Sequence, residues 1–140
     1  MRAIILAAGR GSRINEYSSK HPKCLIKIRN KTLLDWQIKA LNDSGISKIA
    51  IVTGYKKEFF NNMELKRFEN RDWDKTNMVQ SLYCARDWLL KEKCIVSYSD
   101  IFYLSSAIKL LMNDMSDLSI TYDPNWLDLW SLRFKDPLSD

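Results

Sequence analysis

Short apolar runs alternate with longer amphipathic stretches along this chain. The runs at residues 3–8, 49–52 and 94–96 have the length of buried strands, and each leads into small or polar residues. Between them, apolar side chains recur at helical spacing in residues 33–41 and 78–90. Strands and helices that alternate in this order build right-handed β-α-β units and a parallel sheet covered by helices. We therefore predict an α/β fold, in one domain that spans the 140-residue chain.

Polar residues mark the expected ends of the two longer helices. Thr32, with Asp35 three residues later, predicts a capping box at the start of the first helix. Gly45 predicts the end of that helix, because glycine is the usual residue just past a helix C-terminus. Residues 76–77, Thr-Asn, predict the cap of a second helix that runs from Met78 to about Leu90.

Weaker patterns complete the set of expected elements. They predict short helices at 56–63 and 104–112, and strands at 25–28, 65–68 and 118–122. We expect the 65–68 strand to lie toward an edge of the sheet. The 118–122 segment is expected to be the fourth buried strand of the fold.

Composition narrows the classes of partner. The apolar fraction of 46% and the charged fraction of 28% are those of an ordinary globular domain. The net charge of +5 is compatible with a nucleic acid, an acidic membrane or a phosphorylated small molecule. Basic residues are interleaved with acids and form no long tract, so we expect no nucleic-acid and no membrane partner.

Cysteine usage and the opening residues indicate a compartment. Cys24, Cys84 and Cys94 are an odd number without a C-x-x-C pair, which indicates reduced thiols rather than disulfides or a zinc site. The chain opens directly into a strand pattern with no signal-peptide features, and no run reaches the ~20 apolar residues of a membrane span. We therefore expect a cytoplasmic protein.

The candidate chemistry begins in the loop that closes the first apolar run. This stretch reads Leu6, Ala7, Ala8, Gly9, Arg10, Gly11, Ser12 and Arg13. Glycine lets a ligand approach the backbone, and successive free N–H groups form a concavity that binds anions. Cations ring this loop at Arg10, Arg13, Lys20 and Lys23. The loop therefore predicts a polyphosphate site, although a plain glycine-rich turn with surface charge stays open.

Two common phosphate motifs do not match this loop. A dinucleotide-binding fingerprint needs a third glycine where the chain has Ile14, and the P-loop pattern occurs nowhere in the sequence.

Three predicted strands end in residues suited to a ligand site. They end at Ala8-Gly9, at Gly54-Tyr55 and at Asp100. Open α/β sheets bind ligands at the carboxyl ends of their strands, so these residues are expected to converge. Asp100 is a candidate Mg²⁺ ligand, because Mg²⁺ takes one or two carboxylates together with phosphate oxygens and water. A helix cap or a loop acid is the alternative for Asp100.

The loop also carries a family resemblance. Residues 6–13, with Pro22-Lys23 downstream, resemble the L-A-A-G-x-G-x-R … P-K signature of sugar-phosphate and phosphocholine nucleotidyltransferases. Residues 76–82 are similar to the N-x-x-x-S-L segment of bacterial phosphocholine cytidylyltransferases. The resemblance implies a Rossmann-like three-layer α/β/α fold with a mostly parallel sheet, of the nucleotide-diphospho-sugar transferase type. Family members are commonly longer, so we expect a C-terminally truncated chain.

The resemblance also implies a reaction and the residues that carry it. CMP would pass from CTP to a small phosphorylated amine such as phosphocholine, with release of pyrophosphate and with Mg²⁺ as cofactor. The implied catalytic residues are Arg13, Lys23 and Asp100, and Asp100 would also hold the metal. The implied nucleotide-binding residues are Leu6, Ala7, Ala8, Gly9, Arg10, Gly11, Ser12, Gly54, Tyr55, Asn77 and Ser81.

The acceptor has several candidates. An aromatic cage for its ammonium group could comprise Tyr122, Trp126, Asp128 and Trp130. Trp126 and Trp130 also have helical spacing, so an apolar helix stripe is the alternative. A sugar 1-phosphate enzyme and a phosphoglutamine-type cytidylyltransferase stay open. So does a nucleotide-binding module without turnover, because no residue here matches the family's second metal carboxylate. The sequence leaves a homodimer open.

Overall fold

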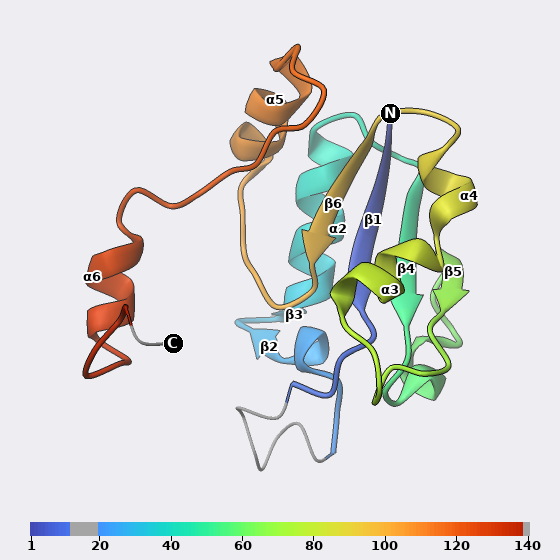
Figure 1. The fold of residues 1–140 in the computed structure, drawn as a ribbon, viewed down its shortest axis with the longest axis horizontal. Helices are drawn as coiled ribbons and strands as arrows, with labels where there is room; N and C mark the ends of the chain where they lie inside the picture. Colours follow the sequence, from blue (N-terminus) through green and yellow to red (C-terminus); the bar gives the residue numbers. More distant parts are fainter. Residues whose placement is uncertain (12–19, 139–140) are drawn as a thin grey trace.

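A parallel sheet of four strands forms the centre of the fold (Figure 1). The structure is a computed structural model, and it describes residues 1–11 and 20–138. The strand order is β5-β4-β1-β6. The strands are β1 (Arg2–Ala7), β4 (Ile49–Thr53), β5 (Lys66–Glu69) and β6 (Cys94–Tyr98). The first strand of the chain therefore lies inside the sheet, between two strands that come later.

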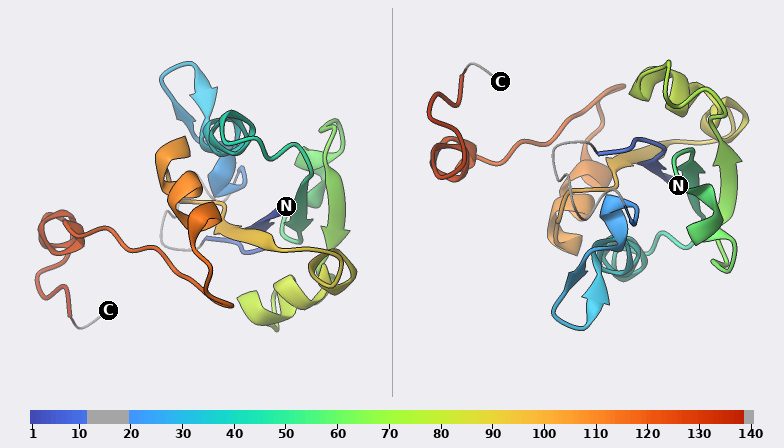
Figure 2. Two further views of the ribbon diagram at one scale, coloured as in Figure 1. Left: turned by 90° about the horizontal axis from the view of Figure 1, so that it is seen from above. Right: turned by 90° about the horizontal axis from the view of Figure 1, so that it is seen from below.

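Helices cover both faces of this sheet. Figure 2 shows α2 (Leu33–Asp43) and α5 (Ser105–Asn113) on one face of the sheet. The other face carries α3 (Met78–Tyr83) and α4 (Arg86–Leu89). The predicted three-layer α/β/α fold with a parallel sheet is confirmed.

The core follows from the alternation of side chains along the strands. Ile5 on β1 packs toward α2 and contacts the cluster that contains Leu34. Its neighbour Ile4 points to the opposite face and packs in the cluster that contains Val52 and Ala85. All five side chains are almost completely buried. Both faces of β1 are thus covered, which explains why this strand reads as a continuous apolar run.

The predicted ends of α2 are confirmed. The Thr32 hydroxyl accepts a hydrogen bond from the Asp35 N–H at 3.0 Å, and the Asp35 carboxylate accepts one from the Thr32 N–H at 2.9 Å. Gly45 follows the C-cap residue Ser44 and adopts a φ of +87°, which is the left-handed conformation that glycine favours.

The predicted helix over 78–90 is divided. Asn77 caps its start as expected, but α3 ends at Tyr83 and α4 begins at Arg86. Ala85 between them has a φ of −101° and a ψ of +16°, outside the helical values. Its side chain is fully buried against the sheet, so the break lets Ala85 pack closely.

Residues 25–28 do not join the main sheet as a strand. The segment starts in a short 3-10 helix, Lys23–Leu25. It continues in β2 (Lys27–Ile28), which forms a small antiparallel hairpin with β3 (Lys31–Thr32). The predicted helix at 56–63 is a single 3-10 turn, Lys57–Phe60.

The prediction of a fourth buried strand at 118–122 is wrong. This segment is extended but pairs with no described strand. Leu118, Ile120 and Tyr122 are 87%, 87% and 81% exposed, because no described layer covers their apolar side. The segment leads to α6 (Trp126–Ser131), which stands apart from the sheet (Figure 1). No helix among the described residues is both long enough and apolar enough to cross a membrane.

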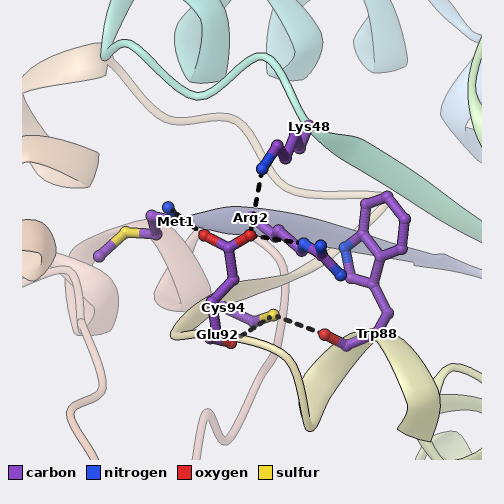
Figure 3. A network of polar contacts seen from close by, with 6 residues as sticks. All are labelled: Met1, Arg2, Lys48, Trp88, Glu92 and Cys94. Atoms are coloured by element: carbon purple, nitrogen blue, oxygen red, sulfur yellow. Dashed lines mark hydrogen bonds and ion pairs between the residues drawn. The ribbon is translucent and has the colours of Figure 1, made fainter.

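A network around Glu92 joins three segments at the amino ends of the strands (Figure 3). One carboxylate oxygen of Glu92 lies 2.7 Å from Arg2 Nε and 3.5 Å from Lys48 Nζ. The other oxygen lies 2.5 Å from the Met1 amine. The Arg2 guanidinium also lies 4.3 Å from the ring centre of Trp88. These contacts tie β1 to the segments that lead into β4 and β6.

The network predicts a pH dependence of stability. Hydrogen bonds from the Met1 amine and from Arg2 lower the pKa of Glu92 to about 2, from its ordinary 4.5. Glu92 therefore stabilises the fold fully above pH 4.5, and this contribution is lost as the pH falls toward 2. The Glu92→Gln variant lacks this carboxylate and therefore lacks its pH-dependent contribution to stability. In urea unfolding across this range, the variant should lose less stability than the unmodified chain. Glu64→Gln, at an exposed glutamate, is the control; equal pH profiles for Glu92→Gln and the unmodified chain would refute the assignment.

Candidate functional site

A pocket of about 250 Å³ lies at the carboxyl ends of β1 and β6. The first loop of the chain, the Pro22-Lys23 segment and the start of α3 form its walls together with the turn after β6. This is the edge of the sheet at which open α/β folds bind their ligands.

Most of the residues predicted to be catalytic or to bind the nucleotide line this pocket. They are Leu6, Ala7, Ala8, Gly9, Gly11, Lys23, Asn77, Ser81 and Asp100. Arg10, Gly54 and Tyr55 do not line it. Ser12 and Arg13 lie outside the described residues.

Gly11 provides room for the side chain of Lys23. Its φ is +68°, a conformation that side-chain-bearing residues rarely adopt. A Cβ placed on Gly11 would overlap the Cγ, Cδ and Cε atoms of Lys23. The aliphatic part of Lys23 therefore lies against the backbone of the loop. This contact directs the ammonium group into the pocket.

Lys23 meets Asp100 across the pocket. The Lys23 Nζ lies 3.7 Å from an Asp100 carboxylate oxygen. The Lys23 side chain is only 17% exposed, whereas Asp100 is 49% exposed and so faces the open part of the pocket. The positively charged Lys23 and the negatively charged Asp100 thus lie beside the loop amides. Lys23 is suited to bind phosphate oxygens, and Asp100 is suited to bind a metal ion that accompanies them.

Cys24 supplies no nucleophile to this site. Its side chain is buried beneath the pocket. Burial raises the pKa of the Cys24 thiol to about 12, so the sulfur stays protonated and unreactive near neutral pH.

The Gly54-Tyr55 turn supports the pocket from behind. The Tyr55 N–H donates to the Ala8 carbonyl at 2.9 Å, which fixes this turn to the end of β1. The Tyr55 ring meets the ring of Trp73 edge-on, with centres 5.1 Å apart. The Arg10 guanidinium lies 6.0 Å from the Tyr55 ring centre. Trp73 lines the pocket, so Tyr55 contacts a lining side chain without lining the pocket itself.

Sequence reasoning missed several of the lining residues. These are Trp73, Thr76, Met78, Tyr98 and Ser99. Trp73 had a usable signal, because it is the single aromatic residue in the polar 71–75 loop. Tyr98 hydrogen-bonds Met78 across the pocket, a contact between distant segments that local patterns cannot reveal.

Asn70 organises the wall that carries Trp73, although no motif marks it. This buried side chain donates to Thr76 Oγ1 at 2.9 Å and to Ser81 Oγ at 3.0 Å. Its carbonyl oxygen accepts from the Asp72 N–H at 3.1 Å. Asn70 therefore ties the loop after β5 to helix α3.

Asn77 and Ser81 have local partners as well as a place in the pocket. The Asn77 side chain accepts hydrogen bonds from the N–H groups of Val79 and Gln80, at 3.0 and 3.3 Å. The Ser81 hydroxyl donates to the Asn77 carbonyl at 3.3 Å. Both residues thus shape the start of α3.

The structure does not bring the predicted acceptor residues to the pocket. Tyr122, Trp126, Asp128 and Trp130 belong to the segment that stands apart from the sheet (Figure 1). The rings of Trp126 and Trp130 pack edge-on against each other, with centres 5.7 Å apart. The assignment of these residues to the acceptor stays a prediction.

A metal ion at this site would rely on Asp100. The described residues contain no group of three or more histidine, cysteine, aspartate or glutamate side chains that could hold an ion alone. A single half-exposed carboxylate fits Mg²⁺, which keeps several waters and completes its shell with substrate phosphates. The residues present are therefore suited to a metal that arrives with a nucleotide.

Comparison with known proteins places the chain among nucleotidyltransferases. Residues 3–120 match the MobA-like NTP transferase domain. A CTP:phosphoglutamine cytidylyltransferase from Campylobacter jejuni is 41% identical, in an alignment that covers 100% of this chain and 59% of that protein. A choline-phosphate cytidylyltransferase from Streptococcus pneumoniae is 38% identical over 70% of this chain and 42% of its own length.

A solved structure agrees with these matches. The CTP:phosphocholine cytidylyltransferase of Streptococcus pneumoniae superposes with a TM-score of 0.68 and 30% sequence identity. The superposition covers 75% of this chain and 49% of that one. The chain thus spans 59% and 42% of the two curated relatives described above. Because the family match extends over residues 3–120, the chain belongs to the family of MobA-like NTP transferase domains.

Proposed function

We propose that this chain binds CTP in the pocket and transfers CMP to a small phosphorylated amine, with release of pyrophosphate. One observation carries the proposal. The glycine-containing loop, the Lys23 ammonium and the Asp100 carboxylate meet in a single pocket at the carboxyl edge of the sheet. That combination suits a triphosphate chain, which needs amides and cations for its oxygens.

The reaction requires positioning more than acid–base chemistry. A phosphate oxygen of the acceptor forms a bond to the α-phosphorus of CTP, and the bond from that phosphorus to the oxygen that bridges the α- and β-phosphates breaks, so that this oxygen leaves with pyrophosphate. The attacking phosphate is already anionic near neutral pH, so no general base is needed. The loop amides and Lys23 hold the triphosphate and offset the charge that develops on the leaving pyrophosphate.

Asp100 is the residue that would hold Mg²⁺. When bound, the ion supplies positive charge to the phosphate oxygens and orients them. The Lys23 ammonium lies 3.7 Å from Asp100 and would bind the phosphate oxygens beside that residue.

The acceptor assignment rests on the relatives. Their names specify phosphoglutamine and choline phosphate as acceptors. Both compounds are small, phosphorylated and contain nitrogen. A nucleotide-binding module without turnover is the second candidate, because Asp100 is the single carboxylate among the described residues that line the pocket.

A thermal-shift comparison tests the function. CTP with Mg²⁺ should raise the Tm of the chain more than ATP, GTP or UTP does, because a ligand that binds only the folded form stabilises it. Pyrophosphate release is then measured with phosphocholine and with phosphoglutamine as acceptors. Release with either acceptor supports transfer, and CTP binding without release supports the binding module. A Tm that no triphosphate changes would overturn both.

Asp100→Asn is expected to remove the Mg²⁺-dependent part of CTP binding. The amide keeps the size of the side chain but loses the negative charge that attracts the ion. Calorimetric titration with CTP, with and without Mg²⁺, should show that the ion no longer strengthens binding in this variant. Asp87→Asn, at an exposed aspartate on α4, is the matched control and should retain the full Mg²⁺ effect. An undiminished Mg²⁺ effect in Asp100→Asn would remove Asp100 from the metal site.

A further inference from the structure

Gln37 is a polar side chain in the core beneath the pocket. It lies on α2, and its side chain is fully buried. Its Nε2 donates hydrogen bonds to the carbonyl oxygens of Tyr98 and Ile101, at 2.8 and 2.6 Å. One side-chain amide therefore holds two backbone groups that lie 61 and 64 residues further along the chain.

These two carbonyls stand on either side of Ser99-Asp100. The turn is also held from the sheet, because the Ser99 N–H donates to the Leu6 carbonyl at 3.2 Å. Asp100 itself is half-exposed and reaches toward Lys23. Its backbone thus has fixed contacts on both sides, while its carboxylate is open to the pocket.

We propose that Gln37 is a positioning residue that fixes the direction of the Asp100 carboxylate for the metal–nucleotide complex. The inference rests on the proposed function, since it concerns how that site is held. Gln37 does not line the pocket, so it acts through the turn and not on the ligand.

The energetics of Gln37 support a role beyond core packing. Its Oε1 is buried and has no hydrogen-bond partner among the described residues. An unpaired buried oxygen weakens a fold, and a purely structural position here would favour an apolar side chain. The neighbouring buried positions of the helix, Leu33, Leu34 and Leu41, are apolar. What the amide adds is the pair of donor hydrogens that reach the Asp100 turn.

Gln37→Met tests the proposal in the full chain. Methionine has a similar length and removes both the unpaired oxygen and the two donated hydrogen bonds. We expect a folded variant whose affinity for Mn²⁺ in the presence of CTP, measured by electron paramagnetic resonance, falls by about tenfold or more, the loss typical of partners that orient metal ligands. Affinity for CTP without metal should change little, since the loop and Lys23 remain in place.

Ser44→Ala is the matched control. Ser44 is the buried residue that caps the C-terminus of α2, and its hydroxyl lies 2.7 and 3.2 Å from the carbonyl oxygens of Ala40 and Ser105 that accept its hydrogen bonds. It therefore joins the same helix to the same region after β6, but away from Asp100. Ser44→Ala should leave Mn²⁺ affinity unchanged. An equal loss in Ser44→Ala and Gln37→Met would show a general structural effect and would overturn the proposal.

A double variant that carries both Gln37→Met and Asp100→Asn distinguishes a positioning role of Gln37 from a general structural role. If Gln37 acts through Asp100, adding Gln37→Met to Asp100→Asn should weaken Mn²⁺ binding no further. Additive losses, or unchanged Mn²⁺ affinity in Gln37→Met alone, would refute the positioning role while CTP binding upholds the function. Failure of the unmodified chain to bind CTP would instead overturn the function, and the inference with it. Gln37→Leu supplies the same comparisons if the methionine variant does not fold.

Discussion

Replacement of Lys23 by alanine is expected to abolish CMP transfer and to weaken CTP binding by about tenfold or more. Among the described residues that line the pocket, Lys23 is the single basic one. Its ammonium group lies beside the backbone amides of the first loop. Loss of a single charge that stabilises developing negative charge commonly lowers a rate by about 10²–10³. Calorimetric titration with CTP and a pyrophosphate-release assay measure the two effects.

Two further variants make the Lys23 result specific. Lys23→Met keeps the aliphatic part that lies against Gly11 and removes the charge, so it should fold normally and still bind CTP poorly. Lys27→Ala removes an exposed lysine from β2, close in the sequence but outside the pocket, and should leave CTP affinity unchanged. If Lys23→Met binds CTP as well as the unmodified chain does, then the charge has no part in gripping the triphosphate.

Gly54→Ala is expected to lower both stability and CTP affinity. A Cβ on Gly54 would lie 2.6 Å from the Cβ of Trp73 and 2.9 Å from the backbone oxygen of Ala8. The added methyl group must displace either the end of β1 or the loop that carries Trp73. Overpacking of this kind commonly costs about 1–3 kcal/mol. We expect a drop in Tm of several degrees, measured by thermal unfolding.

Gly9→Ala is the matched substitution for this test. A Cβ on Gly9 would find no atom within 4 Å, so the same chemical change should leave the Tm nearly unaltered. Equal Tm values for the two variants would show that the approach of the Gly54 turn to Trp73 and Ala8 is not tight in solution.

Local patterns were sufficient to predict the centre of the fold and the first loop of the site. The apolar run that forms β1, the capping box of Thr32 and Asp35, and the Gly9–Gly11 turn each depend on neighbouring residues. The convergence of Ala8-Gly9 and Asp100 in one pocket followed from the rule that parallel strands present their carboxyl ends at one edge.

Long-range contacts account for what sequence reasoning missed. Gln37 read as one more core-facing position on a helix, since its partners lie beyond residue 97. Asn70 and Trp73 acquire their roles when the loop after β5 folds onto α3. The 118–122 segment has a strand-like alternation, yet a strand forms only where a neighbour and a covering layer are present.

The central position of β1 has a consequence for how this chain reaches its native state. Arg2 pairs with Cys94, and Ala3 pairs with Ile49. Because β1 precedes both of its partners in the sequence, it must wait for β6 during synthesis until the chain up to Tyr98 has been made. Such distant pairings close slowly, because a long loop loses entropy before any contact compensates it. Until then the nascent chain exposes one edge of an apolar strand, and unpaired strand edges of this kind are prone to aggregate.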